Sequence, residues 1–233
     1  MTLESAMTVT DEPETVVPGS ASRRRLFLVG LIGAVLAVAI TISVGLFVAV
    51  SRMPGDDSAE AGFARDMSTH HGQAVEMAIL AVQRSELPEI GTLALDIALT
   101  QQAQIGMMRA WLRQWNLSPT ATGPRMAWMQ DESGTDHGGM ATPSSPPARA
   151  GLMPGMATDD ELTALREASG PAFDASFTEL MIRHHIGGLE MVDAVLARDP
   201  VEQVLELAES MKRGQQYEIE ALRQIQTRLR TPR

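Results

Sequence analysis

The longest run of apolar residues lies near the beginning of the chain. Residues 26–50 carry no charge, and nearly all of them are apolar. A helix needs about 20 such residues to cross a bilayer, so this run predicts a transmembrane helix. Arginines occupy positions 23–25 before the run, whereas Arg52 alone follows it closely. Because positive charge gathers on the cytoplasmic side, we expect residues 1–22 in the cytoplasm and everything after residue 52 outside.

A cleaved signal peptide is the alternative interpretation of this segment. Ala49 and Ser51 resemble the small residues of a cleavage site. The apolar core of a signal peptide, however, spans only about 7–15 residues. The length of the run therefore favours an uncleaved anchor over residues 23–52, preceded by a polar tail over residues 1–22 that we expect to be disordered.

After residue 53, apolar residues recur at steps of three and four, which is the spacing of a helical face. One face runs from Phe63 to Ala81, and the next runs from Leu93 to Trp115. Pro88 stands between them, where it suits the first turn of a helix. The pattern lacks strand-like alternation, so it predicts two helices joined by a short connection.

This helical pattern occurs twice, at a constant offset of 114 residues. The motif F-x3-M-x2-H-H-x4-E-M covers residues 63–77 and returns over residues 177–191, and a glutamine pair at 101–102 returns at 215–216. We interpret the two copies as two helical hairpins. Hairpins with apolar faces predict an all-α protein in which an antiparallel, ferritin-like four-helix bundle follows the transmembrane helix.

The sequence between the two copies has a different composition. Residues 117–158 are rich in Pro, Gly, Ser, Thr and Met and show no sustained period. They predict a crossover linker between a first hairpin over residues 53–116 and a second repeat over residues 159–233. We expect residues 57–230 to form one domain.

Local signals predict where the helices of the second repeat begin. Thr158 and Glu161 form a capping-box pattern, which predicts a short helix over about residues 159–168. Gly170-Pro171 marks the start of the next helix. Asp199-Pro200 predicts the cap and the first residue of the last helix.

Composition and charge narrow the function. The chain has 233 residues, no Cys, a single Lys at position 212 and a formal net charge of −10. The lack of Cys excludes disulfides, thiol nucleophiles and zinc–cysteine sites. Because the charges of residues 1–52 cancel, the negative charge lies in the predicted outer part, which argues against binding of nucleic acid and suits cations.

Four of the five histidines stand in two adjacent pairs, one in each copy of the motif: His70, His71, His184 and His185. At 100° per residue, both members of a pair project from the apolar face of their helix or from its edge, whereas Glu76 and Glu190 point away. Two hairpins can bring the four imidazoles together, and imidazole suits copper, zinc, iron and nickel. A buried polar network is the alternative explanation of the histidines.

Methionines accompany the histidine pairs. The candidate thioether ligands on the repeat helices are Met67, Met77, Met181 and Met191, for which core packing is the alternative explanation. The linker adds further soft side chains, which are either copper ligands or incidental: Met126, Met129, His137, Met140, Met153 and Met156. Thioether specifically favours Cu(I), so copper is the expected ion, with zinc and iron as alternatives.

Polar residues on the second helix of each hairpin are candidates to orient the imidazoles by hydrogen bonds: Gln101, Gln104, Gln215 and Glu218. Gln104 and Glu218 occupy equivalent positions in the two copies. Glu218 is alternatively a direct metal ligand.

The doubled motif and the later Q-x-[QE]-I pattern resemble the bacterial domain-of-unknown-function family 305 over about residues 57–230. The resemblance implies a secreted or membrane-anchored, ferritin-like four-helix protein, with copper binding and copper resistance among the family's members. Position by position, it points to Met67, His70, His71, Met77, Met181, His184, His185 and Met191. The chain departs from the family pattern at Ser68-Thr69 and at Ile186-Gly187-Gly188, so equal metal affinity of the two halves is not implied.

The favoured function is a membrane-anchored, extracytoplasmic metal-binding protein that buffers or delivers copper. Its expected partners are the metal ion, the lipid bilayer and a copper-handling or envelope protein, and an enzymatic role is disfavoured. The first alternative is a metal-free interaction or scaffold module of the cell envelope with structural histidines. A di-iron oxidoreductase is the weaker alternative, because neither histidine pair carries the Glu-x-x-His motif of those bundles.

Overall fold

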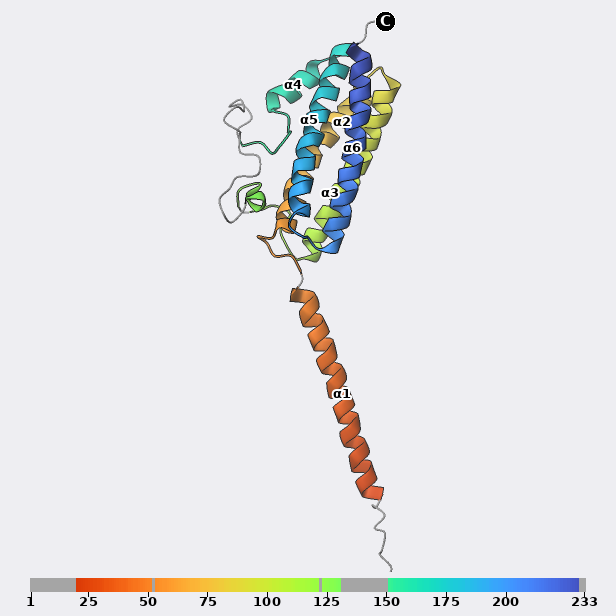
Figure 1. The fold of residues 1–233 in the computed structure, drawn as a ribbon, viewed down its shortest axis with the longest axis vertical. Coiled ribbons are helices and arrows are strands. Elements are labelled where there is room, and N and C mark those ends of the chain that lie inside the picture. The colour runs from red at the N-terminus through yellow and green to blue at the C-terminus, as the bar shows by residue number, and fades with distance from the viewer. Residues whose placement is uncertain (1–19, 52, 122, 131–150, 231–233) are drawn as a thin grey trace, which may run out of the picture. The chain divides into compact units, whose positions relative to one another are not determined.

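The computed structural model describes residues 20–51, 53–121, 123–130 and 151–230. Over these residues the protein consists of six α-helices and one short 3-10 helix, without a β-strand (Figure 1). The predicted all-α class is therefore confirmed. The chain divides after Met53 into two compact units.

The first unit contains the long helix α1 (Ser20–Ser51). Its segment Phe27–Gly45 has a mean hydropathy of 2.6, and none of its side chains is buried. This length and composition suit a helix that crosses a membrane, and an N-terminal signal sequence has the same properties. The expected apolar helix is present, and the choice between anchor and signal peptide stays a prediction.

The second unit holds four long helices. Helix α2 (Ala59–Arg84) packs along α3 (Pro88–Gln114), and α5 (Gly170–Leu196) packs along α6 (Glu202–Arg230). Helix α2 also packs against α5, and α3 packs against α6, so the two hairpins lie side by side (Figure 1). The short elements sit on their outside: η1 (Ala127–Met129) contacts α2 and α5, and α4 (Asp159–Glu167) contacts α5.

Three helix starts agree with the local sequence signals. Pro88 is the first residue of α3, and Pro171 follows Gly170 at the start of α5. The capping box of α4 is also present. The Thr158 hydroxyl accepts a hydrogen bond from the Glu161 backbone N–H at 3.1 Å, and the Glu161 carboxylate accepts one from the Thr158 backbone N–H at 2.9 Å.

The predicted start of the last helix is wrong. Helix α6 begins at Glu202 rather than at Pro200, because Asp199 takes a left-handed backbone conformation with φ of 50°. Glu60 of α2 lies at this helix end instead, where its carboxylate accepts a hydrogen bond from the Val201 backbone N–H at 3.4 Å. A contact with another helix therefore holds the residue that precedes α6.

Two apolar clusters form the core of the second unit. The Phe177 cluster joins the end of α2, the start of α3, the start of α5 and the end of α6. The Phe63 cluster joins the four opposite helix ends. In each cluster, one end of α2 lies against the opposite ends of α3 and α5. Helix α2 therefore runs antiparallel to both α3 and α5. Burial of each large apolar side chain contributes about 1.5–3 kcal/mol to this packing.

Candidate metal centre

Between the two apolar clusters, each long helix contributes two polar residues at the middle of its length. Together they form what we call the histidine layer: His70 and His71 on α2, Gln101 and Gln104 on α3, His184 and His185 on α5, and Gln215 and Glu218 on α6. Its four imidazoles are at most 1% exposed. The rings of His70 and His184 lie 3.8 Å apart between centroids, and those of His184 and His185 lie 6.3 Å apart.

The second helix of each hairpin supplies a hydrogen-bond acceptor to one histidine of the layer. His71 donates from Nε2 to the side-chain oxygen of Gln104 at 2.7 Å. His185 donates from Nε2 to a carboxylate oxygen of Glu218 at 2.6 Å. The two bonds join equivalent positions of the sequence repeat, and they hold each ring with Nδ1 directed away from its acceptor.

His70 has a partner that lies outside the repeat. Its Nε2 donates to the backbone carbonyl of Pro154 at 2.9 Å, and Pro154 belongs to the linker. Gln73, one turn further along α2, makes two hydrogen bonds to the backbone of Ala157 in the same segment. The Gln73 amide nitrogen donates to the Ala157 carbonyl at 2.9 Å, and the Gln73 side-chain oxygen accepts from the Ala157 N–H at 2.7 Å. The Met153–Ala157 segment is therefore fixed against the histidine layer.

Two glycines allow this segment to approach α5 closely. A Cβ atom at Gly187 would overlap the carbonyl of Pro154, and one at Gly155 would overlap the carbonyl of Arg183. Gly155 also has a φ of 72°, which favours glycine. The Gly187-Gly188 departure from the family pattern thus has a structural reason, since Gly188 in turn leaves room for the side chain of Gln215.

The histidine layer contains an excess of buried lone pairs. Among the described residues, no hydrogen-bond partner reaches Nδ1 of His70, His71 or His185. In a neutral ring whose Nε2 donates, Nδ1 carries a lone pair and no hydrogen. The Nε2 atom of His184 and the amide oxygens of Gln101 and Gln215 also lack partners within the described ranges. Unsatisfied acceptors of this kind are costly in a protein interior, and a cation is one kind of group that binds such lone pairs.

Burial also lowers the pKa of three of the imidazoles, those of His70, His71 and His184. It lowers the pKa of His70 to about 4 and, with the charge of neighbouring His70, lowers the pKa of His71 to about 3. Burial and the other three histidines lower the pKa of His184 well below its usual value. Neutral imidazole is the form that binds a metal, so the protein interior removes proton competition at neutral pH.

The structure separates the methionines of the two repeat motifs. Met67 and Met191 lie in the Phe63 cluster, whereas Met77 and Met181 lie in the Phe177 cluster, and all four are fully buried. The linker methionines join the first pair. The Phe63 cluster also contains Met108, Met129, Met153 and Met211, and Met126 and Met156 pack against it. Thioethers are therefore concentrated on the side of the layer where His70 meets the linker.

Other candidates lie away from the layer or outside the described residues. Glu76 is half-exposed and pairs with Arg166, and Glu190 is exposed. Both glutamates point away from the layer, as the helix angles predict. His137 and Met140 lie outside the described residues. Within the described part of the chain, no three His, Asp or Glu side chains converge as they stand on one point that would hold an ion.

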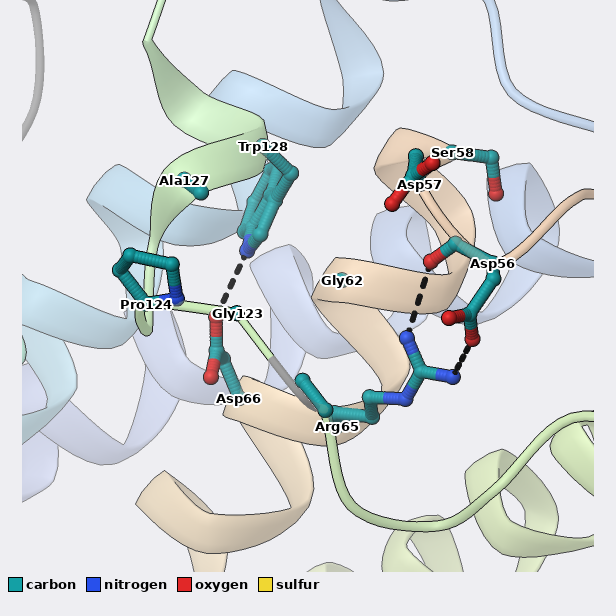
Figure 2. Close-up of a pocket in the computed structure, with 11 residues that line it drawn as sticks. Asp56, Asp57, Ser58, Gly62, Arg65, Asp66, Gly123, Pro124, Ala127 and Trp128 are labelled. Atoms are coloured by element: carbon teal, nitrogen blue, oxygen red, sulfur yellow. Dashed lines mark hydrogen bonds and ion pairs between the residues drawn. The ribbon is translucent and has the colours of Figure 1, made fainter.

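The beginning of the linker is anchored at the start of α2 (Figure 2). A carboxylate oxygen of Asp66 accepts hydrogen bonds from the backbone N–H of Met126 at 2.8 Å and from the indole N–H of Trp128 at 2.9 Å. The Trp128 ring covers Gly62, where a Cβ would overlap it. Arg65, whose side chain pairs with Asp56, lines the pocket of about 180 Å³ beside this contact.

Several residues that shape the centre carry no signal in the helical pattern. Pro154 acts through its backbone carbonyl, and the side chain of Gln73 binds backbone groups, so neither role depends on a recognisable motif. Gly187 was visible only as a departure from the family pattern. Asp66 could have been noticed as a buried-face carboxylate beside Met67, but its partners lie about 60 residues away in the linker.

Comparisons with known proteins agree with this architecture. A family model described as "Domain of unknown function (DUF305)" matches residues 60–226. A crystal structure of a DUF305 protein from Streptomyces coelicolor, described as secreted, is 37% identical, with a TM-score of 0.64 over 75% of this chain and 96% of that chain. A DUF305 fragment from Deinococcus radiodurans is 29% identical, with a TM-score of 0.57 over 73% and 96% of the two chains.

A third solved structure shares the fold at lower identity. It is CopM in its Cu(I)-bound form, which is 23% identical, with a TM-score of 0.54 over 75% of this chain and 99% of that chain. A comparison with curated protein sequences finds no match. The family match spans most of the second unit, including both histidine pairs, and therefore the chain belongs to the DUF305 family.

Proposed function

We propose that this protein binds copper in its histidine layer and that it is a copper-buffering or copper-delivering protein anchored in the membrane, with the second unit outside the cytoplasm. The observation that carries the proposal is that each of the four imidazoles has one buried ring nitrogen without a hydrogen-bond partner among the described residues. A purely structural network would be expected to pair these atoms, because an unsatisfied buried polar group costs about 1–3 kcal/mol. A bound cation would satisfy these atoms, so the folded protein would gain that free energy on binding.

The neighbouring side chains favour copper over other ions. Imidazole alone suits several metals, whereas thioether favours Cu(I). Met67 precedes His70 by one helical turn, and Met153 is adjacent to Pro154, whose carbonyl holds the His70 ring. The structural neighbour CopM, which has been solved with Cu(I), Cu(II) and silver, supports the same choice.

The anchoring rests on α1 and on the charges beside it. Segment Phe27–Gly45 is long and apolar enough to cross a membrane, and arginines precede it at positions 23–25. The positive-inside tendency then directs the second unit away from the cytoplasm. In that oxidising compartment, histidine and methionine can bind copper without the side reactions of cysteine.

Copper binding is tested on the full-length protein in detergent micelles. The metal-free protein competes for Cu(I) with a chromophoric chelator under anaerobic conditions, and the same is done for the variant in which His70 and His184 are both Leu. We expect measurable affinity in the wild type and a loss of at least about tenfold in the variant, which corresponds to about 1.4 kcal/mol. Leu is apolar and fills most of the imidazole volume, so the variant should keep its fold.

Met107→Leu is the matched control, because Met107 is a half-exposed residue of α3 outside the layer. It should bind Cu(I) as the wild type does. If the double histidine variant retains full affinity and its native circular dichroism spectrum, the proposed site is wrong. If the wild type does not bind copper, and its unfolding temperature is unchanged by copper, zinc and chelators, the metal-free scaffold function is the correct one.

A further inference from the structure

The two halves of the histidine layer are alike in position but differ in charge. His71 and His185 are equivalent residues of the sequence repeat, and each donates from Nε2 to a side-chain oxygen 33 residues further along the chain. The acceptor is the neutral amide of Gln104 in the first half and the carboxylate of Glu218 in the second. One residue position thus distinguishes two otherwise matched imidazoles.

The charge of Glu218 is directed at His185. The Glu218 side chain is 12% exposed, and His185 is the one side chain hydrogen-bonded to it in the described part of the protein. The basic residues on the preceding turns of α6 pair elsewhere: Lys212 with Asp193, and Arg213 with Glu209. A carboxylate in this position is weakly screened by water, so its field acts on the ring that it holds.

A carboxylate acceptor changes an imidazole as a ligand. When Nε2–H donates to an anion, electron density shifts toward the opposite ring nitrogen, and that nitrogen becomes a better donor to a metal. The opposite nitrogen of His185, Nδ1, is buried and unpartnered. A neutral amide in the same place fixes the orientation of the His71 ring but supplies no charge to balance a bound cation.

We infer that Glu218 is a positioning and charge-balancing residue that makes the His185 half of the layer the tighter metal site, while the Gln104 half is the weaker one. This inference rests on the proposed copper-binding function and adds an order of filling to it. The first cation binds beside His185, where a single negative charge compensates it. The half that contains His71 then serves as the lower-affinity position.

The test exchanges the two acceptors in the full-length protein. Cu(I) affinity is measured by anaerobic chelator competition for Glu218→Gln, for Gln104→Glu and for the protein with both changes. Glu218→Gln should lower the affinity of the tighter site about 10–100-fold, the usual effect of losing an outer partner of a metal-binding histidine. The exchange of both residues should recover most of the loss. Gln still accepts from His185, as Gln104 does from His71, so the fold should be preserved.

A double-mutant cycle locates the effect. In a His185→Ala background, Glu218→Gln should change the Cu(I) affinity much less than in the wild type, because the carboxylate orients and polarises that ring. An undiminished effect there would show that Glu218 is itself a ligand and would overturn the positioning role. The unfolding temperature of each metal-free variant is measured alongside, and a loss of affinity that merely follows a loss of stability would also overturn it.

The failure of this inference is separable from that of the proposed function. If the wild type binds Cu(I) and Glu218→Gln binds it equally well, the layer is a copper site without the inferred asymmetry. If the wild type binds no Cu(I), the proposed function itself is wrong, and the inferred difference between the two sites is wrong as well.

Discussion

The imidazole rings of His70 and His184 lie 3.8 Å apart, centroid to centroid, with their planes tilted by 35°. The two residues occupy the same position in the two copies of the motif, 114 residues apart, and come from α2 and α5. Two protonated rings at this separation would repel each other strongly in a buried site. Their contact therefore disfavours protonation of both rings at once, burial lowers the pKa of each, and the stability of the protein is linked to pH.

The metal-free protein should lose stability in mild acid. His70 and His71 have native pKa values of about 4 and about 3, below the unfolded value of about 6.5. Between pH 6.5 and 4 the unfolded chain thus binds more protons than the native one, so stability falls as the pH falls. Each of the two histidines should cost about 2 kcal/mol at pH 5. Thermal unfolding of the full-length protein from pH 7.5 to 4.5, followed by circular dichroism, measures the decline.

The variant with Leu at positions 70 and 184 provides the control for this pH dependence. It removes two of the histidines whose pKa values are lowered, so its unfolding temperature should depend less on pH than that of the wild type. Equal slopes in the two proteins would contradict the assignment of the acid sensitivity to the histidine layer.

Gly187→Ala should destabilise the protein although alanine favours a helix. The new Cβ would overlap the Pro154 carbonyl, which accepts the hydrogen bond from His70, so the linker segment must move away from α5. Overpacking of this kind costs about 1–3 kcal/mol. Gly72→Ala is the matched control, because Gly72 lies inside α2 with open space around it and should gain up to about 1 kcal/mol. A stability equal to that of the control would show that the segment does not pack on Gly187.

Asp66→Ala should release the beginning of the linker. The change leaves the backbone N–H of Met126 and the indole N–H of Trp128 without their acceptor. We expect a loss of about 1–3 kcal/mol and a shift of tryptophan emission to longer wavelength as Trp128 becomes hydrated. Asp57→Ala removes an exposed carboxylate from the same pocket and should leave both quantities unchanged. A Trp128→Phe background identifies the emitting residue, since the shift must disappear there.

The combined change Met67→Leu and Met153→Leu should separate soft from harder ions. Both side chains are buried in the Phe63 cluster next to His70 and its linker partner, and Leu nearly conserves their volume. The unfolding free energy should therefore change by less than about 1.5 kcal/mol. Affinity for Cu(I) and Ag(I) should fall by about tenfold or more, while Zn(II) affinity should stay the same, because thioether selects Cu(I)-like ions. Equal losses for zinc and silver in chelator competition would show that the thioethers do not act as ligands.

Much of the secondary structure was predictable because its causes are local. Pro88 and the Thr158–Glu161 capping box begin helices by steric and hydrogen-bonding effects within one turn. The last helix was predicted wrongly at its start because Asp199 takes a left-handed backbone conformation, which the Asp-Pro pair does not reveal. The histidines, and Gln104 as one of four candidate partners, could be chosen from their spacing, whereas the Pro154 carbonyl that accepts from His70 could not.

The sequence by itself determined the all-helical class, the apolar N-terminal helix and the placement of the histidine pairs on the inner helix faces, because periodicity and helix geometry act over a few residues. Only the tertiary structure decided which groups surround those histidines. It directed the Pro154 carbonyl to His70, divided the methionines unequally between two clusters, and left four ring nitrogens without partners among the described residues. These relationships join residues far apart in the chain, and their energies depend on packing, burial and the approach of linker to helix, which no local pattern encodes.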